Sequence, residues 1–284
     1  MSPAAPPSRD RTSPDLERAR ELLGANGGRL GAPFHVLSST GSTNDDAKAG
    51  AKEGAPHGAV WLAEEQSAGR GRQGRTWTAA RGESLLFSVL LRLACPPARV
   101  PLVSLVAGLA VRDAVAKALS GVSGVSGAQV LVKWPNDVVV RDAGVDRKVA
   151  GILVESSLMG AKVEHVVVGI GLNVHTRMFP LELAAIATSV ALAGGRDPDR
   201  GQILADVLAG LDHDVEHVVH RGLSLVLGRL QAADSLLAKP LASEDGSVVG
   251  DGAGIDPEGR LILRQGDGTL VKVSSGEVRL RTRS

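Results

Sequence analysis

Residues Gly69–Trp77 read Gly-Arg-Gly-Arg-Gln-Gly-Arg-Thr-Trp, the most informative stretch of the chain. It lies within Gln66–Arg81, which has neither a helical nor a strand period and joins two apolar, strand-like segments. Glycine lets a backbone approach a ligand closely, and successive amides can cradle an anion. Arginine binds phosphate or carboxylate through two parallel hydrogen bonds. The stretch therefore predicts a loop between two strands of a sheet that binds an anionic small ligand.

Two other interpretations of this loop stay open: a solvated connection, or an arginine- and glycine-rich arm that binds RNA. The chain has 32 Lys and Arg against 31 Asp and Glu, a net charge of +1. A general nucleic-acid binder needs a basic excess to neutralise phosphates. A phosphate-binding P-loop is excluded because no Gly-Lys-Ser/Thr follows the glycines. These observations favour the small anionic ligand.

Length and composition bound the class of protein. The 284 residues suffice for one large or two smaller domains with a sizeable core, and three Trp, three Phe and no Tyr mean that aliphatic residues build that core. Cys95 is the only cysteine, which excludes an intrachain disulfide and a cysteine zinc site. The longest apolar segment, Val100–Leu119, is interrupted by charged residues, and no signal-peptide centre is visible. We therefore expect a cytoplasmic protein with no membrane contact.

Periodicity and turn residues predict an α+β fold, a mixed sheet flanked by helices. We expect strands at Ala59–Ala63, Ser84–Leu93, Val130–Trp134, Val138–Arg141, Val149–Glu155 and Val163–Ile170. We expect helices from Pro14 to the stop at Asn26-Gly27, and at Thr43–Lys52, Val100–Leu119, Leu181–Leu192, Ile203–Val219 and Ser224–Leu237. Ser13 and Ser42 or Thr43 suit the N-caps of the first two helices.

The residue pattern of the sequence changes at Lys239. Short strands alternate with glycine-containing turns, a rhythm typical of a small β-barrel. We expect these strands at Ser247–Gly250, Leu261–Leu263, Leu270–Val273 and Val278–Leu280. The predicted divisions are a disordered tail at 1–13, a main domain at 14–238 and a C-terminal barrel at 239–284.

Lys133-Trp134-Pro135-Asn136-Asp137 places a cation, an aromatic ring, an amide and a carboxylate around a turn fixed by proline. Such groups can face a base edge, a ribose or a Mg²⁺-bound water. An ordinary β-turn explains Pro-Asn-Asp equally well. The preceding Lys-Trp favours a functional site.

Three further segments carry polar groups in unusual places. Lys148 opens an otherwise apolar strand that runs to Glu155, where a lysine is more often simply solvated. Gly169-x-Gly171-x-Asn173 follows a valine-rich strand but lacks the third glycine of a dinucleotide-binding fingerprint. Ser-Thr-Asn at 42–44 supplies more polar groups than a helix cap needs.

In this order, with Glu64-x-Gln66, these segments closely resemble the biotin protein ligase family. The resemblance covers about residues 41–173 and then the small C-terminal β-domain. The arginine loop and Lys-Trp-Pro-Asn-Asp are its most specific parts. Two of the three tryptophans, Trp77 and Trp134, fall inside these two motifs, so we expect their rings beside a ligand and only Trp61 in packing.

The resemblance implies a catalytic domain like that of class II aminoacyl-tRNA synthetases, with an SH3-like C-terminal barrel. It implies activation of biotin by ATP to biotinyl-5′-AMP, and transfer of biotin to one lysine of a biotin carboxyl carrier domain, such as that of acetyl-CoA carboxylase. Mg²⁺ is expected with the ATP phosphates, although no protein ligand for it is identified. The oligomeric state is left as monomer or homodimer.

The resemblance also assigns residues. Positions that match the biotin pocket are Ser42, Thr43, Asn44, Gln66, Gly69, Arg70, Gly71, Arg72, Lys148, Gly151 and Gly169. Positions that match the nucleotide side are Arg75, Trp77, Lys133, Asn136, Asp137 and Asn173. Two anions must be brought together in the first step, so Arg70, Arg72 and Lys148 are the expected catalytic cations. Asp137 is the expected base for the acceptor lysine.

Regulatory members of the family carry an N-terminal DNA-binding domain, for which about 40 residues before Ser42 are too few, so we expect no DNA partner. A lipoate or other acyl-acid ligase of the same fold is the alternative enzyme. An RNA-binding protein and a non-catalytic biotin- or nucleotide-sensing module are alternatives from other classes.

Overall fold

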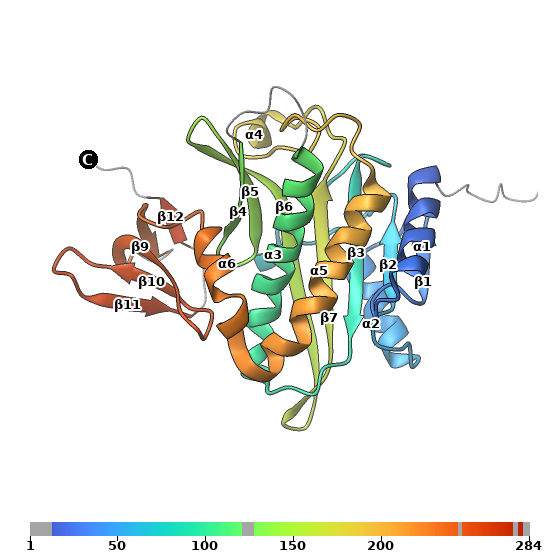
Figure 1. The fold of residues 1–284 in the computed structure, drawn as a ribbon, viewed down its shortest axis with the longest axis horizontal. Helices are drawn as coiled ribbons and strands as arrows, with labels where there is room; N and C mark the ends of the chain where they lie inside the picture. Colours follow the sequence, from blue (N-terminus) through green and yellow to red (C-terminus); the bar gives the residue numbers. More distant parts are fainter. Residues whose placement is uncertain (1–12, 121–127, 244–245, 275–277, 281–284) are drawn as a thin grey trace, which may run out of the picture.

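The computed structural model describes residues 13–120, 128–243, 246–274 and 278–280. Of the predicted tail at 1–13, all but Ser13 lies outside these residues. Within the described ranges, seven strands form a large sheet and five form a smaller one at the C-terminal end of the chain (Figure 1). None of the described helices is long and apolar enough to cross a lipid bilayer.

The large sheet is mixed. Its strands, in spatial order, are β1 (Phe34–Leu37), β2 (Val60–Ala63), β3 (Ser84–Leu91), β7 (Lys162–Asn173), β6 (Val145–Met159), β5 (Asp137–Asp142) and β4 (Gln129–Lys133). The pair β1 and β2 is parallel, and the other neighbours are antiparallel. The predicted α+β class, with a mixed sheet flanked by helices, is confirmed.

Helices cover both faces of this sheet (Figure 1). The described helices are α1 (Pro14–Asn26), α2 (Thr43–Lys52), α3 (Val100–Leu119), α4 (Leu181–Ala184), α5 (Arg200–Arg221) and α6 (Leu227–Ala232). The long helices α3 and α5 pack on one face, where they bury the main apolar core. The short helix α2 packs on the other face, where its alanines and Trp61 form a separate, smaller cluster.

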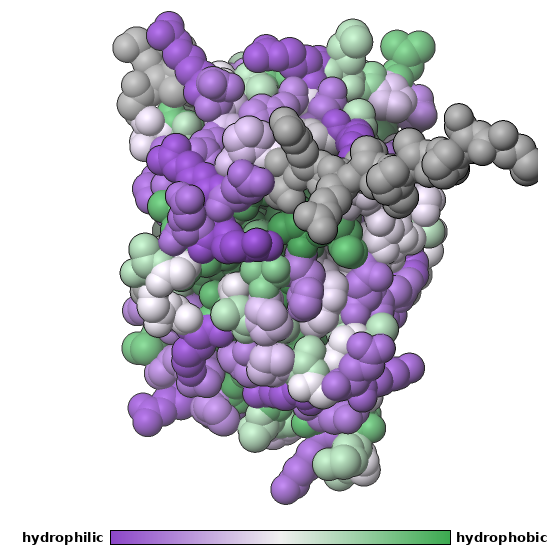
Figure 2. Space-filling model, turned by 90° about the vertical axis from the view of Figure 1, so that its right-hand side faces the viewer, coloured by the Kyte–Doolittle hydropathy of each residue, from purple (hydrophilic) through white to green (hydrophobic). Residues whose placement is uncertain are grey.

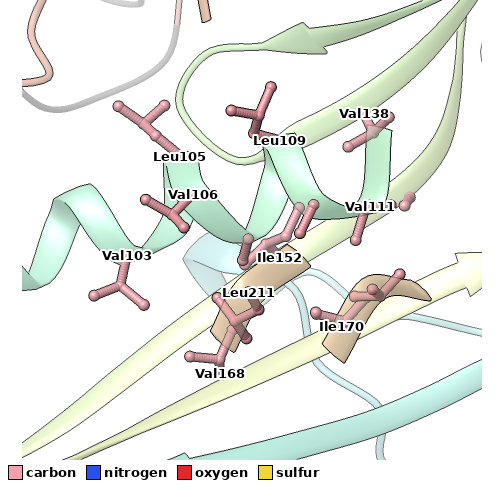
Figure 3. Packing of buried hydrophobic residues seen from close by; sticks show 14 of the residues in the cluster. Val103, Leu105, Val106, Leu109, Val111, Val138, Ile152, Val168, Ile170 and Leu211 are labelled. Carbon is pink, nitrogen blue, oxygen red and sulfur yellow. The ribbon is translucent and has the colours of Figure 1, made fainter. Parts of the chain in front are cut away.

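Strand alternation produces the main core. Ile152 on β6 and Val168 and Ile170 on β7 lie between these strands and the helices α3 and α5, with Val168 beside Leu211 of α5 (Figure 3). Because side chains on a strand alternate between its two faces, the residues between them are left for the opposite face. The core is aliphatic, as the composition predicts.

Both edges of the large sheet have neighbours. Helix α1 lies beside β1, and the molecular face on that side is largely hydrophilic (Figures 1 and 2). At the other edge, Val132 N donates to Ala233 O and Ser235 N donates to Val132 O, at 2.8 and 2.9 Å. Arg112 Nε donates to Val130 O at 2.9 Å. These three outward backbone groups of β4 are therefore hydrogen-bonded.

The small sheet is antiparallel. Its strands, in spatial order, are β11 (Leu270–Val273), β10 (Leu261–Arg264), β9 (Val249–Ile255), β8 (Pro240–Ser243) and β12 (Val278–Leu280). It contacts the large domain through Trp134, whose Nε1 donates to Gly259 O at 3.0 Å. Trp134 is buried in the main core. The expectation that its ring lies beside a ligand is therefore wrong, because the ring fills the junction between the two sheets.

The predicted helix at Leu181–Leu192 is also wrong beyond its first turn. Only Leu181–Ala184 is helical, because the following backbone pairs with β6: Lys148 N donates to Ile186 O and Thr188 N donates to Lys148 O, at 2.7 and 2.8 Å. Ser224–Leu237 contains only the short helix α6 and a 3₁₀ turn. Strands β1 and β8 were not predicted. Ser13 and Ser42 stand at helix N-caps without side-chain capping bonds.

Candidate active site

Two glycines clear space on the face of the sheet opposite α3 and α5. Gly151 and Gly171 lie directly across from each other on β6 and β7, and the ring of Trp77 lies against them. A Cβ on Gly171 would lie 2.5 Å from Trp77 Cε2, and one on Gly151 would lie 3.1 Å from Trp77 Cζ3. The absence of side chains at these positions is therefore what lets an aromatic ring rest on the strands.

Lys148 lies at the centre of this face. Its Nζ is 2.7 Å from Asp137 Oδ1 and 5.4 Å from the centroid of the Trp77 ring. The register between β5 and β6 shifts between Val138 and Val139, next to Lys148, and such a bulge re-aims a side chain. The Lys148 side chain is 36% exposed, so it is paired but still accessible to a ligand. The structure thus joins Lys148, Asp137 and Trp77, which are separate in the sequence.

The start of α2 carries a buried cluster of polar side chains. Thr43 donates from its backbone N and its Oγ1 to Gln66 Oε1, at 2.8 and 3.1 Å. Asn44 Oδ1 accepts from Ser88 Oγ at 2.6 Å, and a Cβ on Gly169 would collide with that Oδ1 atom. Ser42, Thr43 and Asn44 are all buried. Four of the predicted biotin-pocket residues therefore meet here: Thr43, Asn44, Gln66 and Gly169.

Ser88 was not predicted. It lies on β3 in the otherwise apolar run Leu85–Leu91, fully buried, with its Oγ also 2.8 Å from Thr43 Oγ1. A lone hydroxyl in a buried strand was the available signal, since a buried polar group requires a partner.

The arginine loop folds back on itself as a small hairpin. Gly71 N donates to Arg75 O at 2.7 Å, Trp77 N donates to Gly69 O at 2.9 Å, and a 3₁₀ turn spans Arg72–Gly74. The backbone hydrogen bonds at Gly71–Arg75 and at Gly69–Trp77 hold the two arms of the hairpin together. Its base carries Trp77 onto the sheet face described above.

The two central arginines of the loop point to different partners. Arg72 Nη1 donates to Asn136 Oδ1 at 3.2 Å, which brings the loop to the Lys-Trp-Pro-Asn-Asp turn. Arg70 donates from Nη1 and Nη2 to the two carboxylate oxygens of Asp45, each at 2.7 Å. The hydrogen bonds from Arg70 hold the pKa of the Asp45 carboxyl well below its usual range. Arg70 thus faces α2 in this structure, and its catalytic role stays a prediction.

The other residues that were predicted to face the nucleotide make hydrogen bonds or strand pairs within the protein. Asn136 Nδ2 donates to Ile152 O at 2.9 Å, which ties the turn to β6. Lys133 stands opposite Asp137 in the β4–β5 pair. Asn173 is buried, and its Nδ2 donates to Thr188 O at 3.0 Å. The side chain of Asn173 therefore holds the segment that pairs with Lys148.

An exposed apolar segment lies beside Lys148 and was missed in the sequence. Met178, Leu181 and Ile186 are exposed, and the backbone of Ile186 hydrogen-bonds to that of Lys148. Apolar side chains held in water next to a site are typical of a surface that a ligand covers. The helix that was predicted at Leu181–Leu192 concealed this signal.

A buried ion cluster stands at the two ends of the arginine loop. Arg200 donates to Glu64, just before the loop, and to the backbone of Ser84, just after it, at 2.8 and 3.3 Å. It also donates to Asp15 of α1 at 2.7 Å. Burial raises the pKa of Glu64, but the hydrogen bonds from Arg200 and Ser13 outweigh that effect and lower it. Arg200 itself gave no signal in the sequence.

Comparisons with known proteins agree with this geometry. The model of the biotin/lipoate A/B protein ligase family matches residues 36–173, and that of the biotin protein ligase C-terminal domain matches residues 241–281. The biotin–[acetyl-CoA-carboxylase] ligase of Mycobacterium tuberculosis is 36% identical over 284 residues, 95% of this chain and 97% of that protein. The bifunctional ligase/repressor BirA of Bacillus subtilis is 31% identical over 252 residues, 86% of this chain and 72% of that protein.

A solved structure has the same fold. The biotin protein ligase from Aquifex aeolicus in complex with biotin and ATP superposes with a TM-score of 0.71 at 27% identity, over 88% of this chain and 100% of that one. The chain therefore belongs to the biotin/lipoate A/B protein ligase family. Within it, the C-terminal domain and the named relatives make this chain a biotin protein ligase, an enzyme. The ligase interpretation thus prevails over the RNA-binding one.

Proposed function

We propose that the chain activates biotin with ATP to biotinyl-5′-AMP, releasing pyrophosphate, and then passes the biotinyl group to one lysine of a carrier domain. The observation that carries the proposal is the position of Lys148. Its ammonium group is paired with Asp137 of the Lys-Trp-Pro-Asn-Asp turn and lies beside the ring of Trp77, over the sheet that also carries Gly169, against which Asn44 packs. A cation placed there can contact both a carboxylate and a phosphate.

The first step is a problem of charge rather than of proton transfer. The biotin carboxylate is already an anion, and its oxygen attacks the α-phosphorus while pyrophosphate leaves. Lys148, which Asp137 holds, and Arg72, which donates to Asn136, would stabilise the added negative charge in this step. Asp137 holds the ammonium group of Lys148 at 2.7 Å and so fixes its direction before the substrates arrive.

Mg²⁺ would arrive with ATP. The described residues contain no group of three or more His, Cys, Asp or Glu that could hold a metal ion on its own. Side-chain oxygens of the type that Mg²⁺ accepts beside phosphates are present on Asp137 and Asn136, but Lys148 and Arg72 already bind them, so we assign no protein ligand to the ion. When bound, the ion would neutralise charge on the phosphates.

The adenine is expected beside Trp77 and the exposed apolar segment. A planar ring gains from stacking on Trp77, and Met178, Leu181 and Ile186 would lose water-exposed apolar surface. A hairpin closed over the mixed anhydride also keeps water from hydrolysing it.

The second step needs a base. The acceptor lysine is protonated in water, and its amine must lose a proton before it attacks the acyl carbon and releases AMP. Asp137 is the carboxylate at the reaction centre, and we assign it this role. The partner that presents such a lysine is a biotin carboxyl carrier domain, in keeping with the names of the relatives.

The decisive experiment is mass spectrometry of a biotin carboxyl carrier domain incubated with biotin, Mg-ATP and the chain. We expect a shift of one biotinyl group on one lysine, and no shift without ATP. A parallel incubation with lipoate and a lipoyl domain tests the other activity of the family. A lipoyl shift without a biotinyl shift would contradict the proposal.

A further inference from the structure

Four charged side chains gather at the base of the arginine loop, and we call them the α2 cluster: Asp45, Lys48, Arg70 and Glu155. Beyond the paired hydrogen bonds of Arg70 to Asp45, Lys48 Nζ lies 2.8 Å from Asp45 Oδ1 and 2.9 Å from Glu155 Oε1. Arg70 Nη2 lies 3.8 Å from Glu155 Oε2. The cluster therefore ties the loop to both α2 and β6.

The same cluster reaches the biotin pocket. Glu155 Oε2 accepts from Asn44 Nδ2 at 2.7 Å, and Asn44 in turn accepts from Ser88. Burial raises the pKa of Glu155, but its hydrogen bonds from Asn44 and Lys48 outweigh burial and lower it. Both carboxylates of the cluster therefore stay charged at neutral pH, and one of them also orients a pocket amide.

Two arginine side chains attach the arginine loop to other elements. Its hairpin is bonded internally between Gly69 and Trp77, so it can move as a unit. Arg70 attaches that unit to α2 and Arg72 attaches it to Asn136. The side chains of Arg70 and Asp45 are 38% and 50% exposed, so their pair breaks at small cost and is screened by salt. A pair with these properties holds a loop closed without locking it.

We propose that Asp45, supported by Lys48 and Glu155, is a latch that acts through Arg70 to keep the arginine loop closed over the acyl-adenylate. Asp45 is thus a positioning residue: it touches neither substrate but sets how long the reactive intermediate is retained. The proposal rests on the proposed function, because it needs an adenylate to retain.

The test measures release of biotinyl-AMP from Asp45→Asn. The enzyme is loaded with radiolabelled biotin and Mg-ATP without a carrier, and the adenylate that leaves is separated by rapid filtration. We expect release about fivefold faster than from the unsubstituted chain, the upper range for one exposed ion pair. Biotinylation of free amines should rise by a similar factor, whereas the rate of adenylate formation stays unchanged.

Asp46→Asn is the matched control. Asp46 lies in the same first turn of α2, so the substitution removes the same charge at the same end of the helix. It accepts a hydrogen bond from Thr40, at 2.8 Å, outside the α2 cluster. Its release rate should equal that of the unsubstituted chain, and Asp45→Glu should restore retention.

Two measurements separate a latch from a general loss of structure. The ratio of the release rates of Asp45→Asn and the unsubstituted chain should fall toward one as salt rises from 50 mM to about 0.5 M, where the Debye length is only a few ångströms. Asp45→Asn combined with Arg70→Gln should release no faster than Arg70→Gln alone. Thermal melting checks the fold of each variant.

The outcomes are distinguishable. Equal release from Asp45→Asn and the unsubstituted chain at low salt overturns the latch. A release rate in the double variant that is the product of two independent effects also overturns it. If the unsubstituted chain forms no biotinyl-AMP at all, the proposed function fails instead.

Discussion

The two faces of strand β7 differ in what they require of a side chain. Val168 and Ile170 fill the core beneath α3 and α5, whereas Gly169 and Gly171 leave space for Asn44 and Trp77 on the opposite face. On the first face the free energy of folding depends on the volume that is present. On the second face the site depends on volume that is absent. One period of two residues therefore encodes both stability and function.

The largest effect is expected on the open face, at Lys148→Ala. Loss of a cation that stabilises charge in the transition state should slow biotin-dependent ATP–pyrophosphate exchange by about a thousandfold or more. The ammonium is partly exposed, so the melting temperature should stay nearly unchanged. An unchanged exchange rate would show that Lys148 takes no part in the first step. It would also contradict the assignment of function to the open face of the sheet.

Removing a side chain from the core face of the sheet is expected to lower stability rather than activity. Ile170→Ala should lower the free energy of unfolding by about 3 kcal/mol, since the side chain is buried and its removal leaves a cavity. Denaturant unfolding measures the loss, and KM for biotin and ATP should stay constant in the folded protein. A large change in KM would show that the two faces are not independent.

A gain of volume on the open face should reverse that pattern. Gly171→Ala puts a methyl group 2.5 Å from the Trp77 ring and so moves the ring off the sheet. We expect KM for ATP to rise about tenfold, equivalent to ~1.4 kcal/mol, with a small change in stability. Gly108→Ala is the control, because its Cβ would meet Val132 at an ordinary 3.5 Å.

The smallest effect is expected at Trp134, which its motif suggested to lie beside the ligand but which the structure buries in the core. Trp134→Phe keeps a ring in the core but leaves Gly259 O without its donor, a loss of about 1 kcal/mol in the free energy of unfolding. KM for ATP should not change. A rise in KM for ATP would show that Trp134 affects nucleotide binding. It would contradict the division between a core face and a functional face.

Much of the fold was predictable because local patterns and tertiary structure agree. Val100–Leu119 is a helix over the predicted residues, and the strands around Lys148 and Gly169 lie where the apolar runs placed them. The conformation of segment 185–192 was not predictable, because its backbone hydrogen-bonds to β6, a strand far away in the sequence. Trp134 was misplaced for a similar reason: the C-terminal sheet that receives its ring is more than a hundred residues away.

The candidate site divides in the same way. Ser-Thr-Asn at 42–44, the arginine loop and the Lys-Trp-Pro-Asn-Asp turn are contiguous motifs whose chemistry is visible in the sequence. Ser88, Arg200 and Asp45 were not predicted as site residues, because their importance arises from partners on other elements. The domain boundary near Ala238, the cytoplasmic location and the roles of individual site residues stay predictions.

The hydrogen bonds along β4 bear on how copies of the chain can meet. An outer strand with free amides and carbonyls invites a strand from another molecule, which is a common route to aggregation. Here the chain leading to the small sheet uses both backbone groups of Val132, and Arg112 occupies the carbonyl of Val130. A strand from a second molecule could pair with Val132 only by displacing the segment that leads to the C-terminal sheet, so the attachment of that sheet also blocks strand addition at this point.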